Sequence, residues 1–199
     1  MFIFTLVTTK QLIMKTSIKG INASDYINFD TALNTGLKLL NDSKKEKLGL
    51  YILTAIYTGL RTGDIQRLTW NDFNGESFTI QEEKTGKFRT IQINDTLRKA
   101  INKNRSGSGL IFVSQKKSVY TTQALNRMLK DTFRQLAKKE NISTHSLRKT
   151  FGRRVYEMNG QSEHALVKLS EMFGHSSVGL TRVYLGIKQQ ELNEIYMNL

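Results

Sequence analysis

Apolar residues recur along this chain mostly at intervals of three and four, the spacing that gathers them on one face of a helix. Leu33, Leu37 and Leu40 show this spacing, and they follow Asp30, a residue type that often caps helices. The same pattern predicts helices over residues 31–41, 44–58, 63–68, 95–103, 121–139, 146–158, 163–173, 177–184 and 189–198.

The period changes to two in the middle of the chain. Residues 77–82 and 88–93 alternate as strands do, and the segment between them contains Gly86, which favours a hairpin turn. Residues 109–114 form a short apolar run that we interpret as a further strand. The prediction is a mainly α fold with a small antiparallel β-sheet (α+β). We expect an N-terminal arm over residues 1–25 and one domain over residues 26–199.

Composition excludes several classes of protein. No apolar run reaches the roughly 18–20 residues of a membrane-spanning helix, so no membrane protein is expected. The opening MFIFTLV has neither a basic region nor a small-residue cleavage site, and we interpret it as a strand or arm rather than a signal peptide. With no cysteine and three histidines, we expect neither a disulfide scaffold nor a metal site. An intracellular setting follows.

The net charge of the chain indicates the kind of molecule that it binds. Thirty Lys and Arg against 17 Asp and Glu give a net charge of +13, most of it in the second half of the chain. A basic balance of this size suits a polyanion, most often nucleic acid.

Two places in the first half hold polar residues that packing does not require. Arg61 stands between an apolar helix and a short one, where an arginine usually has an anionic partner; an internal salt bridge to Asp64 is the structural alternative. Lys84 lies at the predicted hairpin turn with Lys87 and Arg89 nearby, and such lysines are most often solvated turn residues.

Two further places lie in the second half. His145 and Arg148 are three residues apart at a helix start, where an anion is already favoured; a capping histidine and a surface arginine are the alternative. His175 precedes Tyr184 by nine residues, and alone this tyrosine reads as a core aromatic.

Taken together, these residues occur in the order Arg, Lys, His-x-x-Arg, His, Tyr, within TGLRTGDIQRL, EEKTGKFRTIQI, HSLRKTF and FGHSSVGLTRVYL. This order and spacing resembles the catalytic set of the tyrosine recombinases, or phage integrase family, over about residues 30–199. Two departures are Lys149, where the family often has a second histidine, and Phe173, where leucine is usual.

The resemblance implies a reaction at a DNA phosphodiester. Tyr184 would attack the phosphorus to give a 3′-phosphotyrosine and a free 5′-hydroxyl. Lys84 would act as the general acid that protonates the leaving 5′-oxygen, and His145 would exchange a proton with the tyrosine. A phenol with a pKa of about 10 needs such help at neutral pH.

The same resemblance assigns the phosphate-binding groups. Arg61 and Arg148 would grip the non-bridging oxygens, where charge grows in the transition state, and His175 would orient the phosphate. Asp64 would hold Arg61 in place. The candidate DNA-contacting residues are Lys87, Arg89, Lys149 and Arg182.

The function thus implied is that of a site-specific DNA recombinase or integrase that cuts and rejoins strands without metal, cofactor or ATP. We expect double-stranded DNA as the partner, a monomer in isolation, and a tetramer on DNA joined through exchange of helix 189–198. A cytoplasmic setting in a bacterium, phage or mobile element follows. The alternatives are a non-catalytic DNA-binding regulator on the same fold and a type IB topoisomerase-like enzyme.

Overall fold

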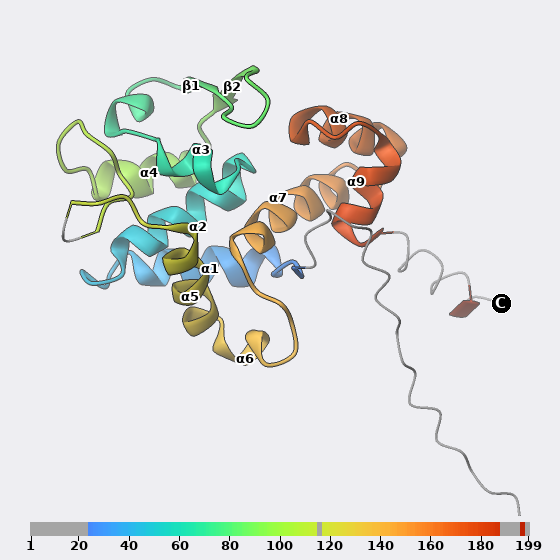
Figure 1. The fold of residues 1–199 in the computed structure, drawn as a ribbon, viewed down its shortest axis with the longest axis horizontal. Helices are drawn as coiled ribbons and strands as arrows, with labels where there is room; N and C mark the ends of the chain where they lie inside the picture. The colour runs from blue at the N-terminus through green and yellow to red at the C-terminus, as the bar shows by residue number, and fades with distance from the viewer. Residues whose placement is uncertain (1–23, 115–116, 188–195, 198–199) are drawn as a thin grey trace, which may run out of the picture.

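The computed structural model describes residues 24–114, 117–187 and 196–197, and within them the chain is mainly helical with one two-stranded sheet (Figure 1). The fold class expected from the sequence is therefore confirmed. The elements in chain order are α1 (Phe29–Leu39), α2 (Glu46–Thr58), α3 (Thr62–Gln66), a 3₁₀ turn (Trp70–Phe73), β1 (Ser77–Gln81), β2 (Phe88–Gln92), α4 (Asp95–Lys103), α5 (Thr122–Thr132), α6 (Arg134–Ala137), α7 (Thr144–Met158), α8 (Glu163–Phe173) and α9 (Val178–Leu185).

Helix α2 is the centre of the larger apolar cluster. Its residues from Leu48 to Ile56 are all buried, because α1, α3, α4 and α7 pack around it. A helix that is apolar on every side must lie inside the protein. Gly59, in the left-handed conformation with φ 61°, ends α2 and turns the chain toward α3.

The hairpin lies at the edge of this cluster. Its strands pair antiparallel, from Ser77 with Gln92 to Gln81 with Phe88. In the turn, the Glu82 N–H donates to the Lys87 carbonyl at 2.9 Å. Figure 1 shows the hairpin reaching toward α8.

A smaller apolar cluster joins α7, α8 and α9. Its central side chains include Phe151, Leu169 and Phe173, all buried, and Tyr184 belongs to it. Because α7 also packs on α1, α2 and α5, this helix connects the two clusters. Figure 1 shows α8 and α9 on the side of α7 away from α1 and α2.

Several predicted bounds were wrong. The helix expected over 121–139 is broken at Phe133 (φ −100°, ψ 38°), whose side chain turns into the core, so that α5 and α6 are separate. The strand expected over 109–114 is only a pair of isolated bridges, from Leu110 to Thr69 and from Val113 to Val119.

Two helices also begin earlier in the sequence than predicted. The first helix begins at Phe29 with Asn28 as its cap, and α7 begins two residues earlier than predicted, at Thr144, with Ser143 as its cap. The arm over 1–25 lies outside the described residues except for its last two, and helix 189–198 lies outside them except for Tyr196 and Met197.

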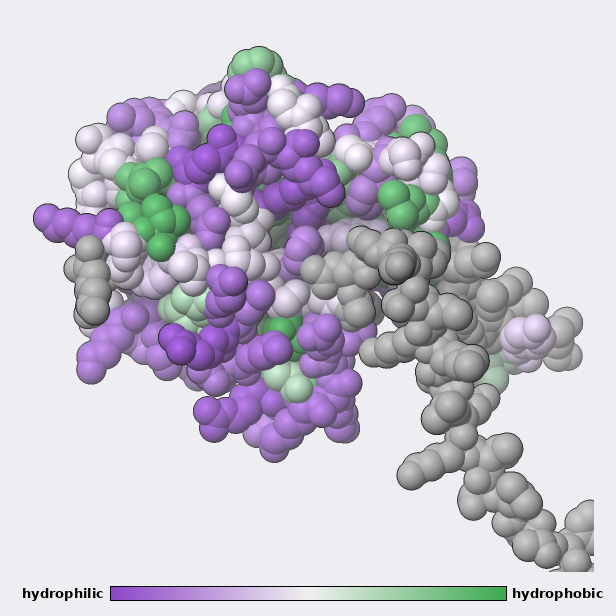
Figure 2. All heavy atoms as spheres, in the orientation of Figure 1, coloured by the Kyte–Doolittle hydropathy of each residue, from purple (hydrophilic) through white to green (hydrophobic). Residues whose placement is uncertain are grey.

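The surface seen in Figure 2 is mostly hydrophilic, with scattered apolar side chains. Within the described part of the chain, no helix has the length and apolar character needed to cross a bilayer. Nor do the described residues contain a group of three or more side chains that could hold a metal ion.

Candidate DNA-cleavage site

Arg61 lies where α2 gives way to α3, and its guanidinium is held from two sides. Nη1 donates to the Glu82 carboxylate at 2.9 Å, and Nη2 donates to the Phe173 carbonyl at 2.6 Å. The first acceptor belongs to the hairpin and the second to the end of α8. The side chain keeps 19% of its exposure, so one side of it still faces solvent.

Arg148 reaches the same carbonyl from α7. Its Nη2 donates to the Phe173 carbonyl at 3.2 Å, and its Nη1 donates to the Gly59 carbonyl at 2.5 Å. The guanidinium carbon lies 4.4 Å from the centroid of the Phe173 ring. Burial lowers the pKa of Arg148 to about 10, which still leaves it charged at neutral pH. Two arginines 87 positions apart in the sequence therefore meet at one point.

The two histidines come from the start of α7 and from the segment that follows α8. His145 is exposed in the first turn of α7, three residues before Arg148. His175 follows Gly174, the left-handed residue that ends α8, and its Nδ1 is 2.9 Å from the Thr181 hydroxyl.

Both histidines have a lowered pKa, which favours the neutral imidazole at pH 7. Burial lowers the pKa of His175 to about 4, together with the charges of Arg148, Arg61 and Lys84. Partial desolvation of its ring and the charges of Arg148, Lys149, Lys84 and Arg61 also lower the pKa of His145. A neutral imidazole can accept a proton or a hydrogen bond, as general acid-base chemistry requires.

Tyr184 lies on α9 and packs on His175, with ring centroids 5.2 Å apart, and on Phe173, at 5.5 Å. Only 8% of the residue is exposed. Its hydroxyl is buried beside the Arg148 guanidinium without the geometry of a full hydrogen bond. Burial raises the pKa of this phenol to about 12, although the charges of Arg148 and Arg61 act in the opposite direction.

Lys84 is exposed in the hairpin turn. Together with Arg61, Gly63, Asp64 and Glu83 it lines a pocket of about 300 Å³. The turn therefore places an exposed ammonium in the same pocket as Arg61. The predicted residues Arg61, Lys84, His145, Arg148, His175 and Tyr184 thus lie around one basic region.

Asp64 does not hold Arg61 as expected. Its Oδ1 accepts from Arg67 Nη2 at 2.8 Å and from the Glu83 N–H at 2.9 Å. The reason is local: Arg61 is the extended residue before α3 and its side chain runs to the hairpin and α8, whereas Asp64 faces the backbone at the hairpin turn. The carboxylate on Arg61 is that of Glu82, which sequence reasoning missed.

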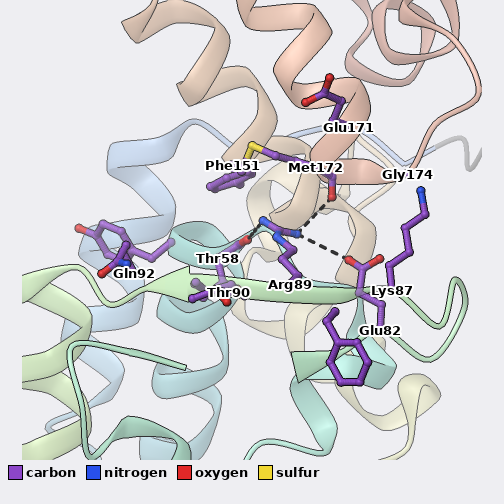
Figure 3. Close-up of a pocket in the computed structure, with 13 residues that line it drawn as sticks. Thr58, Glu82, Lys87, Arg89, Thr90, Gln92, Phe151, Glu171, Met172 and Gly174 are labelled. Carbon is purple, nitrogen blue, oxygen red and sulfur yellow. Dashed lines mark hydrogen bonds and ion pairs between the residues drawn. The ribbon is translucent and has the colours of Figure 1, made fainter. Parts of the chain in front are cut away.

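Two of the four residues predicted to contact DNA form hydrogen bonds within the protein instead. Arg89 is half-buried, and it donates to the carbonyls of Thr58 at 2.9 Å and Met172 at 3.2 Å (Figure 3). Its guanidinium ties the sheet to α2 and α8 and does not face outward. Lys149 is 8% exposed, and its Nζ donates to the Ser24 carbonyl at 2.6 Å. Both side chains donate to backbone carbonyls within the protein, so neither remains a candidate DNA contact.

The other two remain candidates. Lys87 is exposed on the hairpin, at the rim of a cavity of about 390 Å³ between the sheet and α8 (Figure 3). Arg182 is partly exposed on α9, where its Nη2 contacts the Glu163 carboxylate at 2.6 Å.

Comparison with known proteins finds integrases and recombinases. A model described as the phage integrase family matches residues 12–191. The probable integrase/recombinase YoeC of Bacillus subtilis is 32% identical over 168 residues, which cover 79% of this chain and 86% of that protein. Tyrosine recombinase XerC of Caldanaerobacter subterraneus is 29% identical over 177 residues, 81% of this chain and 48% of XerC.

Solved structures agree in fold. XerH recombinase bound to its palindromic difH substrate superposes with a TM-score of 0.66 at 21% identity, over 88% of this chain and 53% of that one. The catalytic domain of bacteriophage HP1 integrase gives 0.56 at 23% identity, over 81% and 86%. The chain spans about half the length of XerC and of the XerH structure.

Proposed function

Since the chain belongs to the phage integrase family and carries a tyrosine recombinase catalytic domain, we propose that it is a site-specific DNA recombinase that cuts and rejoins strands through a 3′-phosphotyrosine. The observation that carries this proposal is the meeting of Arg61 and Arg148 at the Phe173 carbonyl, with Tyr184 packed beside them. Two guanidinium groups at one point suit the non-bridging oxygens of one phosphate.

The proposed chemistry is a transesterification. The Tyr184 oxygen forms a bond to phosphorus as the bond from phosphorus to the 5′-oxygen breaks. The phenol proton passes to neutral His145, and Lys84 gives a proton to the leaving 5′-oxygen. The negative charge that grows on the phosphate is stabilised by Arg61 and Arg148.

Neither metal nor ATP enters this scheme. The arginines supply the positive charge, and the phosphotyrosine keeps the energy of the broken ester, so the reverse attack by a 5′-hydroxyl reseals the strand. In the ground state Tyr184 is buried and its pKa is raised, so the nucleophile needs both the base and the cations around it.

Double-stranded DNA is the proposed partner. The XerH structure holds its difH substrate, and the integrase of transposon Tn1549 is described in complex with circular intermediate DNA. The net charge of +13 supports the same partner for this chain. We keep the proposal of a four-protomer complex joined through residues 189–198 in a cytoplasmic setting; cross-linking on DNA, with and without that segment, tests the assembly.

The test of the function is covalent trapping. A pool of nicked duplexes with randomised sequence around the nick loses its short 5′-hydroxyl fragment after cleavage, so the adduct accumulates and is read on a denaturing gel. We expect an adduct with the unaltered chain and none with Tyr184→Phe, while DNA binding persists. Tyr156→Phe and Tyr196→Phe, the matched controls, should form it normally.

Other outcomes of the trapping experiment would contradict the proposal. An adduct with Tyr184→Phe would overturn the assignment of the nucleophile. Binding without any adduct would favour a DNA-binding regulator. Relaxation of a supercoiled plasmid of any sequence by the monomer would favour a type IB topoisomerase-like enzyme.

A further inference from the structure

Glu82 is a buried carboxylate at the base of the hairpin turn that carries Lys84. The residue is 4% exposed. Its N–H donates to the Lys87 carbonyl at 2.9 Å, and its carbonyl accepts from the Gly86 N–H at 2.8 Å. These two hydrogen bonds fix the backbone of Glu82 within the turn, and the Thr85 hydroxyl holds its carboxylate from the same turn.

The carboxylate is surrounded by donors. Oε2 accepts from Arg61 Nη1 at 2.9 Å and from the Thr85 hydroxyl at 2.9 Å. Oε1 lies 3.7 Å from Arg89 Nη1, an ion pair that Figure 3 shows. Burial alone would raise the pKa of Glu82. The Thr85 hydroxyl and the guanidinium of Arg61, with the charge of Arg148, outweigh it and lower the pKa, so the group is ionised.

The two anchors of Arg61 come from different parts of the fold. Glu82 belongs to the hairpin, and the Phe173 carbonyl belongs to the last turn of α8. A guanidinium is planar and rigid, so two fixed acceptors determine the plane in which its remaining N–H groups point. Those remaining groups are the ones available to a phosphate.

The Glu82 carboxylate also reduces the electrostatic repulsion among three neighbouring arginines. Arg61, Arg148 and Arg89 all donate to backbone carbonyls at the end of α8, and like charges this close repel one another. Without Glu82, Arg61 would lose one of its two anchors and the negative charge that favours its present position.

We propose that Glu82 is a positioning residue for strand cleavage, which holds the Arg61 guanidinium in the orientation that grips a non-bridging oxygen of the scissile phosphate. The inference rests on the proposed function, because it needs that phosphate to be the substrate. It adds a residue outside the set that the sequence pattern indicated.

The test compares Glu82→Gln on three nicked duplexes that differ only at the scissile phosphate. The first is unmodified. In the second, a methyl group replaces one non-bridging oxygen, which removes the negative charge and so the need for a second guanidinium. In the third, sulfur replaces the 5′-bridging oxygen, which makes a leaving group that needs no general acid.

We expect Glu82→Gln to form adduct about 100-fold more slowly than the unaltered chain on the unmodified duplex, as misplacement of a catalytic group by about 1 Å can cause. On the methyl-substituted duplex the two should agree within about threefold. The sulfur duplex should not restore Glu82→Gln, but it should restore Lys84→Ala. Glu76→Gln removes the same charge from an exposed site beside the hairpin and should match the unaltered chain on every duplex.

Three results would overturn the inference. Normal cleavage by Glu82→Gln would show that the carboxylate is not needed. Restoration by sulfur would show that it acts through Lys84 and not Arg61. Restoration by neither duplex would indicate a structural role alone, since no change in the substrate repairs a misfolded site. Failure of the unaltered chain on all three duplexes would instead count against the proposed function.

Discussion

Among single residues, His175 should give the protein a distinct dependence of stability on pH. Its pKa in the fold is about 4, lowered by burial and by Arg148, Arg61 and Lys84, against 6.5 in a model peptide. Between these values the unfolded chain binds more protons, so the free energy of unfolding falls as the pH drops from 6.5 toward 4.

His175→Asn keeps a partner for the Thr181 hydroxyl and removes this titration. We expect its loss of stability between pH 7 and 4.5 to be smaller than that of the unaltered chain by about 1 kcal/mol, after allowance for solvent screening of a half-buried group. Denaturant unfolding at the two pH values measures it. His164→Asn, at an exposed position, should follow the unaltered chain; if His175→Asn does too, the explanation fails.

The sequence predicted which single residues form the site, but it did not predict which side chains form ion pairs with one another. The order of Arg61, His145, Arg148, His175 and Tyr184 indicated one site. In the structure Arg61, Arg148, His175 and Tyr184 gather around Phe173, and His145 lies three residues before Arg148 on α7. The Asp64 prediction failed because proximity in the sequence is a poor guide to partners of a long side chain at a helix start.

A signal for Glu82 was present in the sequence. Alternation along the first strand places Phe78, Ile80 and Glu82 on the same face, and Phe78 is buried. A carboxylate on a buried face needs a cation. The pattern could therefore have assigned Glu82 a partner, although not Arg61 in particular.

Among the elements, the end of α2 links the fold to the site. Gly59 has φ 61°, its carbonyl accepts from Arg148, and a Cβ there would lie 2.3 Å from Cδ1 of Phe151. Gly59→Ala therefore combines backbone strain of about 1 kcal/mol with overpacking of about 1–3 kcal/mol.

Gly86→Ala is the matched control, because Gly86 also has a positive φ of 66° but nothing lies within 4 Å of its would-be Cβ. We expect Gly86→Ala to cost about 1 kcal/mol of unfolding free energy and Gly59→Ala about 2–4 kcal/mol. Denaturant unfolding compares them. Equal losses would mean that Phe151 moves away freely and that the end of α2 does not fix Arg148.

Predictions of helix bounds succeeded where the local sequence determines both ends of the helix. The helices expected over 95–103 and 163–173 have the predicted bounds, since a cap and a regular apolar face determine them locally. The segment 121–139 failed because Phe133 turns into the core and breaks the helix, which only the surrounding structure can require. In the run 109–114 only Ile111 and Phe112 are buried, and its pairing is limited to isolated bridges, so the apolar run does not form a strand.

In the whole molecule, the candidate site lies where two apolar clusters meet. Arg61 directly follows Leu60 of the larger cluster, and Phe173 and Tyr184 belong to the smaller one. Arg148 comes from α7, which packs on both. No local pattern in the sequence encodes such a junction, since it depends on contacts between residues about a hundred positions apart. The family resemblance predicted the convergence; the shared Phe173 carbonyl became evident only from the structure.

The fit of the smaller cluster against α7 depends on Gly152. A Cβ there would lie 2.6 Å from Cδ2 of Leu185 and 3.0 Å from the Phe173 ring, the two neighbours that flank the site. Alanine would gain about 1 kcal/mol in helix propensity but lose about 1–3 kcal/mol by overpacking. Because Leu185 follows Tyr184 directly on α9, the strain should displace the nucleophile.

Gly152→Ala should therefore slow adduct formation more than it weakens DNA binding, with a net loss of about 1–2 kcal/mol in unfolding free energy. Gly179→Ala on α9 is the control, since its would-be Cβ meets only the Ser177 hydroxyl at 3.8 Å, an ordinary contact, and the change should leave cleavage intact. Trapping gels, binding isotherms and unfolding curves of both variants separate the effects. If Gly152→Ala cleaved normally while losing stability, the smaller cluster would tolerate a shift of α9, and the resting position of Tyr184 would not determine the rate of attack.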